Sequence, residues 1–141
     1  ECENAEGDDI IATLKKKFRN QFEELPIYII TNDHDYLQLF DNNTYIYNLQ
    51  GLNLRTKSRG EEIDLKLKIL QGDTSDNISS IFNKRITINK ILEYVYDNEK
   101  LEKYLEENEE SKKLYDRNKL LIDFNMIPEN IKLNINSLIE I

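Results

Sequence analysis

Three short segments of the sequence are rich in carboxylate side chains. They are Glu6-Gly7-Asp8-Asp9, Asp33-His34-Asp35 and Asp73-Thr74-Ser75-Asp76. Clustered carboxylates repel one another unless a cation lies between them, and hard divalent ions such as Mg²⁺ prefer oxygen ligands. Two such ions about 3.5–4 Å apart stabilise both the attacking and the leaving oxygen of a phosphoryl displacement. The three segments are therefore candidate ligands for divalent metal ions.

Each acidic segment on its own also has a structural explanation. Aspartate is common at turns and helix starts, where its side chain accepts hydrogen bonds from backbone amides. Asp33 does not begin a calcium-binding loop, because Leu37 and Thr44 occupy the fifth and twelfth positions, where that loop needs its ligands. The single His34 and the single Cys2 cannot supply a zinc site. No phosphate-binding or dinucleotide-binding glycine pattern is present.

The acidic segments adjoin predicted helices and strands. Apolar residues at helical spacing predict a helix over residues 6–20, with the first acidic segment in its first turn. The apolar run 27–31 is typical of a strand buried on both faces of a parallel sheet, and a second strand is predicted at 44–48. Asp33 and Asp35 directly follow the first strand. Ligands of α/β proteins bind outside the carboxyl ends of the strands, so this position favours a binding site.

The second half of the chain is predicted to be mainly helical. Residues 61–70 alternate like a strand but also fit one helical face, so periodicity alone leaves both open. Three helices are predicted after that, at about 87–97, 99–107 and 111–122. Pro128 ends this helical region. Residues 131–141 are interpreted as a short tail of alternating or irregular character.

Composition restricts the classes of protein to which the chain can belong. Its 141 residues, 39% hydrophobic and 33% charged, are enough for one globular domain with a modest core. No apolar run approaches the roughly 20 residues of a membrane-spanning helix, and the acidic N-terminus is unlike a secretory signal. The net charge of −8 argues against a simple nucleic-acid-binding module, because such modules are basic. An acidic protein still works on DNA where bound metal ions reverse the field around its carboxylates.

The three acidic segments, in this order, resemble three motifs of the flap endonuclease/5′–3′ exonuclease family. Ala5–Ile11 is similar to the family's E-A-D-D-I-I, with Gly7 in place of the usual alanine. Ile30–Leu39 is similar to I-T-x-D-x-D-x-x-Q-L, and Lys68–Ile78 is similar to L-x-G-D-x-S-D-N-I. A weaker likeness continues through residues 118–128, where the chain looks like exonucleases of large DNA viruses. Three motifs in the family's order form a much stronger signal than any one alone.

The resemblance implies an α/β fold. The family has a PIN-like domain, here a partial parallel sheet with flanking helices, followed by a C-terminal helical region of the helix–3-turn–helix type. It divides the chain into residues 1–77, the C-terminal part of the nuclease core, and residues 78–141, a helical DNA-binding region and tail. It also favours a helix for residues 61–70.

The resemblance further implies a catalytic metal site. Asp9 matches the extra acid of the first motif and is expected to cap its helix and not to bind metal. The expected catalytic and metal-binding residues are Glu6, Asp8, Asp33 and Asp35, with Asp73 and Asp76 at a second metal. Mg²⁺ is the expected ion, and Mn²⁺ is expected to substitute for it. The family hydrolyses DNA phosphodiesters near a 5′ end or at a 5′ flap, by water attack between two metal ions. Expected partners are DNA with 5′ ends or flaps and a replication protein, in intracellular replication or repair.

Two departures from the family limit what this chain is expected to do alone. In the family, strands with two further active-site aspartates and a basic helical arch precede the first motif, so we expect such a segment before Glu1 and little activity without it. The family's hairpin is glycine-rich and approaches a phosphate and a potassium ion, whereas residues 78–90 contain no glycine. Lys84, Arg85 and Lys90 can still contact DNA phosphates as point charges. The stretch gives no support for a potassium site.

Two other functions are compatible with the sequence. The absent acids and the glycine-free hairpin also fit a catalytically incomplete remnant of the same fold that binds DNA or a protein. A PIN-type ribonuclease would use the same carboxylate chemistry on RNA, although the S-D-N-I element and the helices after it favour DNA.

Overall fold

The computed structural model describes residues 2–140, which form two compact units. The first, here called the sheet unit, extends to Glu61 and also includes the segment from Ile127 onward. The second, the helical unit, comprises Glu62–Met126. The functional division predicted after residue 77 falls within the helical unit, in the loop that follows its first helix, and stays a prediction.

The sheet unit is built around two parallel strands. Its elements are α1 (Gly7–Gln21), β1 (Ile27–Ile30), η1 (His34–Leu39), β2 (Thr44–Tyr47), η2 (Leu54–Lys57) and α6 (Glu129–Ser137), where η marks a 3₁₀ helix. β1 and β2 pair in parallel, from Ile27 opposite Thr44 to Ile30 opposite Tyr47. Parallel strands need a crossover connection, and η1 lies within it. The small parallel sheet with flanking helices confirms the predicted fold class.

β1 is buried on one face only, so the prediction of a strand buried on both faces was wrong. Ile29 is 9% exposed and Ile46 of β2 is fully buried, but Tyr28 and Ile30 are 62% and 68% exposed. Successive residues of a strand point to opposite faces of the sheet, which explains this alternation. On the exposed face, Tyr28 stacks on Tyr45 of β2 with ring centroids 5.1 Å apart. An apolar run indicates a strand but does not reveal which neighbours cover each face.

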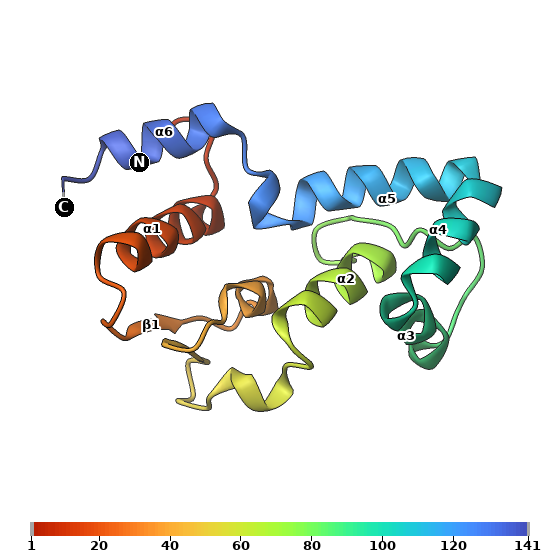
Figure 1. Ribbon diagram of the computed structural model, residues 1–141, viewed down its shortest axis with the longest axis horizontal. Coiled ribbons are helices and arrows are strands. Elements are labelled where there is room, and N and C mark those ends of the chain that lie inside the picture. Colours follow the sequence, from red (N-terminus) through yellow and green to blue (C-terminus); the bar gives the residue numbers. More distant parts are fainter. Residues whose placement is uncertain (1, 141) are drawn as a thin grey trace. The chain divides into compact units, whose positions relative to one another are not determined.

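The segment after Pro128 forms a helix, so the prediction of an irregular tail over residues 131–141 was also wrong. Pro128 is the N-cap residue of α6, which packs against α1 in the sheet unit (Figure 1). Ile131 and Ile135 lie one helical turn apart and are both buried. Leu133, between them, is 61% exposed, which explains why the segment looked alternating. Residue 141 lies outside the described residues.

The helical unit contains the longer helical segments and its own core. Its elements are α2 (Glu61–Gln71, beginning at the boundary with the sheet unit), α3 (Ile88–Tyr96), α4 (Asn98–Glu107), α5 (Glu109–Ile122) and the 3₁₀ turn η3 (Phe124–Met126). The core consists of Leu67, Leu70, Ile81, Ile91, Val95, Leu101 and Leu105. Helix α2 settles the ambiguity over residues 61–70, and the three predicted later helices are confirmed. Within residues 2–140, no helix in either unit has the length and apolarity to cross a membrane.

Candidate active site

The first acidic segment forms the start of α1. Glu6 is the N-cap residue, and the carboxylate of Asp9 accepts a hydrogen bond from the backbone N–H of Glu6 at 3.0 Å. This confirms that Asp9 caps the helix. Asp8 accepts a hydrogen bond from the backbone N–H of Asp9 at 2.9 Å and is half-buried, whereas Glu6 is exposed. Negative charge is stabilised here, because the helix dipole is positive at the N-terminus.

The second acidic segment lies directly beyond the carboxyl end of β1, as predicted. Asp33 is the N-cap residue of η1, and its carboxylate accepts a hydrogen bond from the backbone N–H of Asp35 at 2.8 Å. The Thr31 hydroxyl accepts a hydrogen bond from the backbone N–H of Asp33 at 3.0 Å. These two bonds fix the carboxylate of Asp33 relative to the strand. Asp35 is half-buried in the first turn of η1.

The charge of Asp33 acts on Asp8. Burial raises the pKa of Asp8, and the negative charges of Asp9 and Asp33 raise it further. Burial also raises the pKa of the Tyr36 hydroxyl, and the charges of Asp8 and Asp33 add to that shift. Such effects require the charged groups to lie in one neighbourhood. The sheet unit therefore brings Asp8, Asp33 and Tyr36 together from α1, the end of β1 and η1.

The helical unit carries the other two predicted ligands in the loop after α2. Lys68 forms an ion pair with Asp73, with its ammonium nitrogen 2.7 Å from one carboxylate oxygen. The other oxygen accepts hydrogen bonds from the backbone N–H and the hydroxyl of Ser75, at 2.9 and 2.5 Å. The hydrogen bonds from Lys68 and Ser75 lower the pKa of Asp73 to about 2. Asp73 is thus ionised at neutral pH, and Asp76 is exposed at the loop tip.

The loop that carries Asp73 and Asp76 is a tight turn closed by backbone pairing. The backbone N–H of Asp73 donates to the carbonyl of Ile78 at 2.8 Å, and the N–H of Ile78 donates back at 2.7 Å. Gly72 precedes this pair with φ of +76°, and a β-carbon on it would lie 2.4 Å from the Ile78 oxygen. Only glycine fits such a position. This explains the glycine of the G-D-T-S-D-N sequence.

Comparison with known proteins identifies the family. The model of the family described as 5′-3′ exonuclease, N-terminal resolvase-like domain, matches residues 1–69. The chain is also 36% identical, over an alignment 146 positions long, to the ribonuclease H of Enterobacteria phage T4, covering 92% of this chain and 47% of that protein. The chain belongs to the flap endonuclease/5′–3′ exonuclease family. It spans about half the length of this phage relative.

Solved structures of lower sequence identity show the same fold. The bacteriophage T5 D15 protein co-crystallised with metal ions superimposes with a TM-score of 0.75 at 15% identity, over 97% of this chain and 59% of that chain. A pseudo-enzyme-product complex of the T5 D15 flap endonuclease with DNA and metal ions gives a TM-score of 0.68 at 14% identity, over 92% and 57%. The PIN-like fold of this flap endonuclease family member is therefore supported over nearly the whole chain.

Asn118 is a residue of this family member that the sequence reasoning missed. It is fully buried in α5, and its side-chain nitrogen donates hydrogen bonds to the backbone oxygens of Ile69 and Ser79, both at 2.9 Å. These two carbonyls flank the loop that carries Asp73 and Asp76. A signal was present, because Asn118 lies one helical turn before the buried Ile122 and so falls on the buried face of α5.

The three predicted DNA-binding cations differ in their surroundings. Lys84 and Arg85 are exposed in the segment before α3, and among residues 2–140 neither side chain has an ion-pair partner. Lys90 lies in the first turn of α3, and its ammonium nitrogen is 2.8 Å from a carboxylate oxygen of Glu93. Lys84 and Arg85 are thus available to phosphates without breaking an existing ion pair, whereas Lys90 is not.

Proposed function

We propose that this chain supplies metal-binding carboxylates and part of the DNA-binding surface of a Mg²⁺-dependent, structure-specific 5′ nuclease. The observation that carries the proposal is the proximity of Asp8, half-buried in the first turn of α1, to Asp33, exposed beyond β1, where the charge of Asp33 raises the pKa of Asp8. Membership of the flap endonuclease/5′–3′ exonuclease family supports the same function. The proposed reaction is hydrolysis of DNA phosphodiesters by a two-metal mechanism in replication or repair.

The donor atoms of the cluster fit a hard divalent ion. Carboxylate oxygens are the ligands that Mg²⁺ and Mn²⁺ prefer, and the charges acting on Asp8 are those of other carboxylates. In this proposal Glu6, Asp8, Asp33 and Asp35 hold the first ion, and Asp73 and Asp76 hold the second. When bound, such ions lower the pKa of water and stabilise the charge of the displaced phosphate. Residue Asp73 would have to exchange its ion pair with Lys68 for this role.

The proposed substrate is DNA with a 5′ end or a 5′ flap. The complex of the T5 D15 flap endonuclease with DNA and metal ions supports this substrate class. In the helical unit, Lys84 and Arg85 would contact phosphates of the DNA. Lys90 would do so after its ion pair with Glu93 breaks. A replication protein as partner and an intracellular site of action belong to the same proposal.

Metal binding tests the carboxylate assignment directly. Isothermal titration with Mg²⁺ and with Mn²⁺ should show binding to the 141-residue chain. The double variant Asp8→Asn/Asp33→Asn should weaken that binding at least about tenfold, because it removes two anionic ligands. Asp116→Asn is the matched control, since Asp116 is an exposed acid of α5 paired with Lys112 at 3.3 Å. Equal affinities for the double variant and the control would refute the assignment.

Cleavage distinguishes a nuclease from a binding remnant. A labelled oligonucleotide with a single-stranded 5′ flap is incubated in Mg²⁺ or in EDTA, with the chain alone and with the chain joined to the segment that the family places before its first motif. Mg²⁺-dependent cleavage by the longer protein that is lost in Asp8→Asn/Asp33→Asn would support the nuclease. Binding of flap DNA by the longer protein without any cleavage in Mg²⁺ or Mn²⁺ would favour the catalytically incomplete remnant, and preferential cleavage of RNA would favour a ribonuclease.

A further inference from the structure

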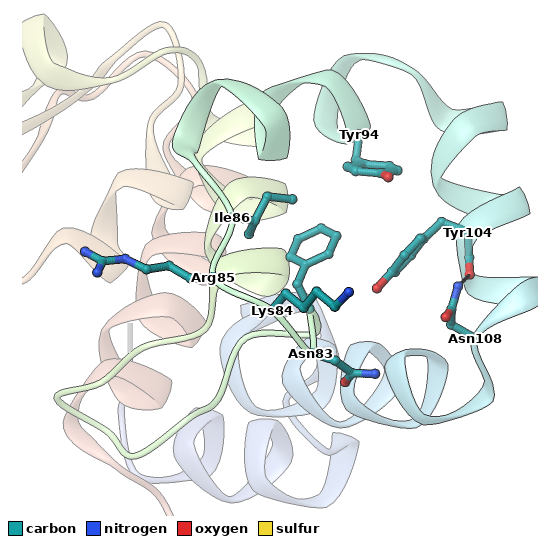
Figure 2. A pocket seen from close by; sticks show the side chains of 8 residues that line it. Asn83, Lys84, Arg85, Ile86, Tyr94, Tyr104 and Asn108 are labelled. Atoms are coloured by element: carbon teal, nitrogen blue, oxygen red, sulfur yellow. Dashed lines mark hydrogen bonds between the residues drawn. The ribbon is translucent and has the colours of Figure 1, made fainter.

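The helical unit contains a pocket that the proposed carboxylate chemistry does not use. It has a volume of about 370 Å³ and is lined by the segment Phe82–Ile86, by Tyr94 of α3, by Tyr104 of α4 and by Asn108 (Figure 2). This volume lies within the range of small-molecule sites, about 300–1,000 Å³. The pocket includes Lys84, which has no ion-pair partner among residues 2–140, so a positive charge lies beside an apolar surface.

Three aromatic rings form one wall of the pocket. The ring centroids of Phe82, Tyr94 and Tyr104 lie 5.3–5.4 Å apart, in tilted pairs. The Tyr104 hydroxyl is hydrogen-bonded to the Ser111 hydroxyl at 3.2 Å, and the Lys100 ammonium lies 5.2 Å from the centre of the Tyr94 ring. These contacts hold the rings in place before any ligand arrives. All three rings are only half-buried, although they pack against the core.

Polar side chains lie on the other side of the opening. Figure 2 shows Lys84 extended toward Tyr104, with the amide of Asn83 beside it, whereas Arg85 points away from the rings. Among residues 2–140, the side chains of Asn83 and Lys84 have no hydrogen-bond or ion-pair partner. The side-chain nitrogen of Asn108 donates to the backbone oxygen of Tyr104 at 2.8 Å, which orients its amide at the rim.

We propose that this pocket binds one unstacked base of single-stranded DNA, with Lys84 holding an adjacent phosphate. Proteins that bind single strands combine aromatic rings, on which bases stack, with cations that follow the backbone. Amides such as Asn83 and Asn108 can pair with the polar edge of a base. The choice of DNA rests on the proposed function, in which a single-stranded 5′ flap is part of the substrate.

A single strand fits the pocket better than the two other candidate occupants. The bases of a duplex are stacked inside the helix, so their faces cannot reach a ring at the protein surface. An apolar peptide side chain would fill the aromatic wall but would offer no polar partner to Asn83 and Lys84. A base with its phosphate satisfies the rings, the amides and the cation together.

Fluorescence anisotropy of a labelled single-stranded oligonucleotide tests the proposal. The full 141-residue chain is titrated in EDTA, so that metal binding at the carboxylates plays no part. A failure of this test would therefore count against the pocket and not against the proposed metal-dependent nuclease. Tyr94→Leu should raise Kd roughly 5- to 150-fold, the loss expected for one stacked base. Tyr94→Phe keeps the ring and should bind like the parent protein. Tyr96→Leu, an equally aromatic but 64% exposed position on the same helix, should also have no effect.

Salt dependence tests the role of Lys84 independently. Lys84→Ala should reduce the slope of log Kd against log salt by about 0.7, the value for one phosphate contact on a single strand. Lys113→Ala, an exposed α5 residue paired with Glu109, should leave the slope unchanged. The base assignment would be overturned by equal loss of affinity in Tyr94→Leu and Tyr96→Leu, or by an abasic oligonucleotide that binds as tightly as the normal one. Tighter binding of duplex, or of RNA of the same sequence, would overturn the choice of single-stranded DNA.

Discussion

The side-chain nitrogen of Asn118 lies 2.9 Å from the backbone oxygen of Ser79 and donates a hydrogen bond to it. The same nitrogen donates to the backbone oxygen of Ile69, near the end of α2. Ile69 and Ser79 lie on either side of the loop that carries Asp73 and Asp76. One buried side chain of α5 therefore holds both ends of the acidic loop.

Removal of this amide should destabilise the helical unit. Asn118→Ala leaves the buried carbonyl of Ile69 without this donor, and an unsatisfied buried group costs about 1–3 kcal/mol. The carbonyl of the exposed Ser79 also accepts from Arg117 at 3.5 Å and adds less. We expect the free energy of unfolding to fall by about 1–3 kcal/mol, measured by urea denaturation followed by circular dichroism. Asn89→Ala, at an exposed position in α3, should change stability by less than about 0.5 kcal/mol. Similar losses in both variants would show that the two hydrogen bonds contribute little.

Gly72 should tolerate no side chain. In Gly72→Ala the new β-carbon would lie 2.4 Å from the backbone oxygen of Ile78 and 2.6 Å from the backbone carbon of Ser79. Both contacts are with backbone, so relief requires the loop itself to move. We expect a loss of at least about 3 kcal/mol in the free energy of unfolding, from the clash and the left-handed backbone together.

Gly51 provides a control for the backbone contribution alone. Its φ of +78° nearly equals that of Gly72, but nothing lies within 4 Å of the position of its β-carbon. Gly51→Ala should therefore lower the free energy of unfolding by only about 1–2 kcal/mol, the cost of a left-handed backbone at a residue with a β-carbon. If the two alanine variants were equally unstable, the close approach of Ile78 to Gly72 would not be what constrains the loop.

Local patterns predicted much of the fold and the position of the acids. An apolar run followed by a polar segment indicates the end of a strand, and this pattern predicts Asp33 beyond the carboxyl end of β1. The family motif leaves Asp9 as an extra acid, and its place in the first helical turn, where acids are favoured, is consistent with a helix cap. Each inference depends on residues close together in the chain, and the structure agrees with both.

Features that depend on distant contacts were not predicted. The role of Asn118 requires Ser79, which is 39 residues away in the sequence. Exposure of Ile30 depends on which elements cover β1, and the hydrophobicity of the strand carries no such information. The segment around Leu133 looked irregular because helical and alternating patterns coincide over a few residues. The aromatic pocket brings Phe82 near Tyr104 through the packing of α3 and α4, which no spacing indicates.

Asp41 should make the stability of the sheet unit depend on pH. Its carboxylate forms ion pairs with Lys15 at 2.6 Å and Arg19 at 3.2 Å, both on α1. Burial alone raises the pKa of Asp41, but hydrogen bonds from Lys15 and Thr44 outweigh burial and hold that pKa well below its usual 3.8. A lowered pKa in the folded state adds stability above the unfolded value, and this stability is lost as the pH falls below about 4.

The variant Asp41→Asn tests this linkage. At pH 7 it should reduce the free energy of unfolding by about 1–3 kcal/mol, because it removes the charge that Lys15 and Arg19 share. At pH 3 the difference from the parent should be about 1 kcal/mol smaller, since the unfolded Asp41 is then mostly protonated. Urea denaturation at both pH values measures the two differences. The control Asp116→Asn breaks the exposed ion pair with Lys112 and should change the free energy of unfolding by less than about 0.5 kcal/mol at either pH. If Asp41→Asn had the same effect at pH 7 and pH 3, the lowered pKa of Asp41 would be contradicted.

Lys17 should anchor the end of α6 to α1. Its ammonium nitrogen donates hydrogen bonds to the backbone oxygens of Asn136 and Ile139, at 3.0 and 2.6 Å. Asn136 lies in the last turn of α6, where carbonyls lack partners within the helix, and Ile139 follows the end of that helix. A cation there also interacts favourably with the helix dipole. Lys17→Met keeps the apolar part of the side chain but removes both hydrogen bonds. The free energy of unfolding should therefore fall by about 1–3 kcal/mol, and the backbone amides of α6 should exchange with deuterium faster than in the parent protein. Lys16→Met alters an exposed neighbour on the same helix and should leave α6 exchange unchanged. Unchanged exchange in Lys17→Met as well would mean that the buried Ile131 and Ile135 hold α6 without the lysine.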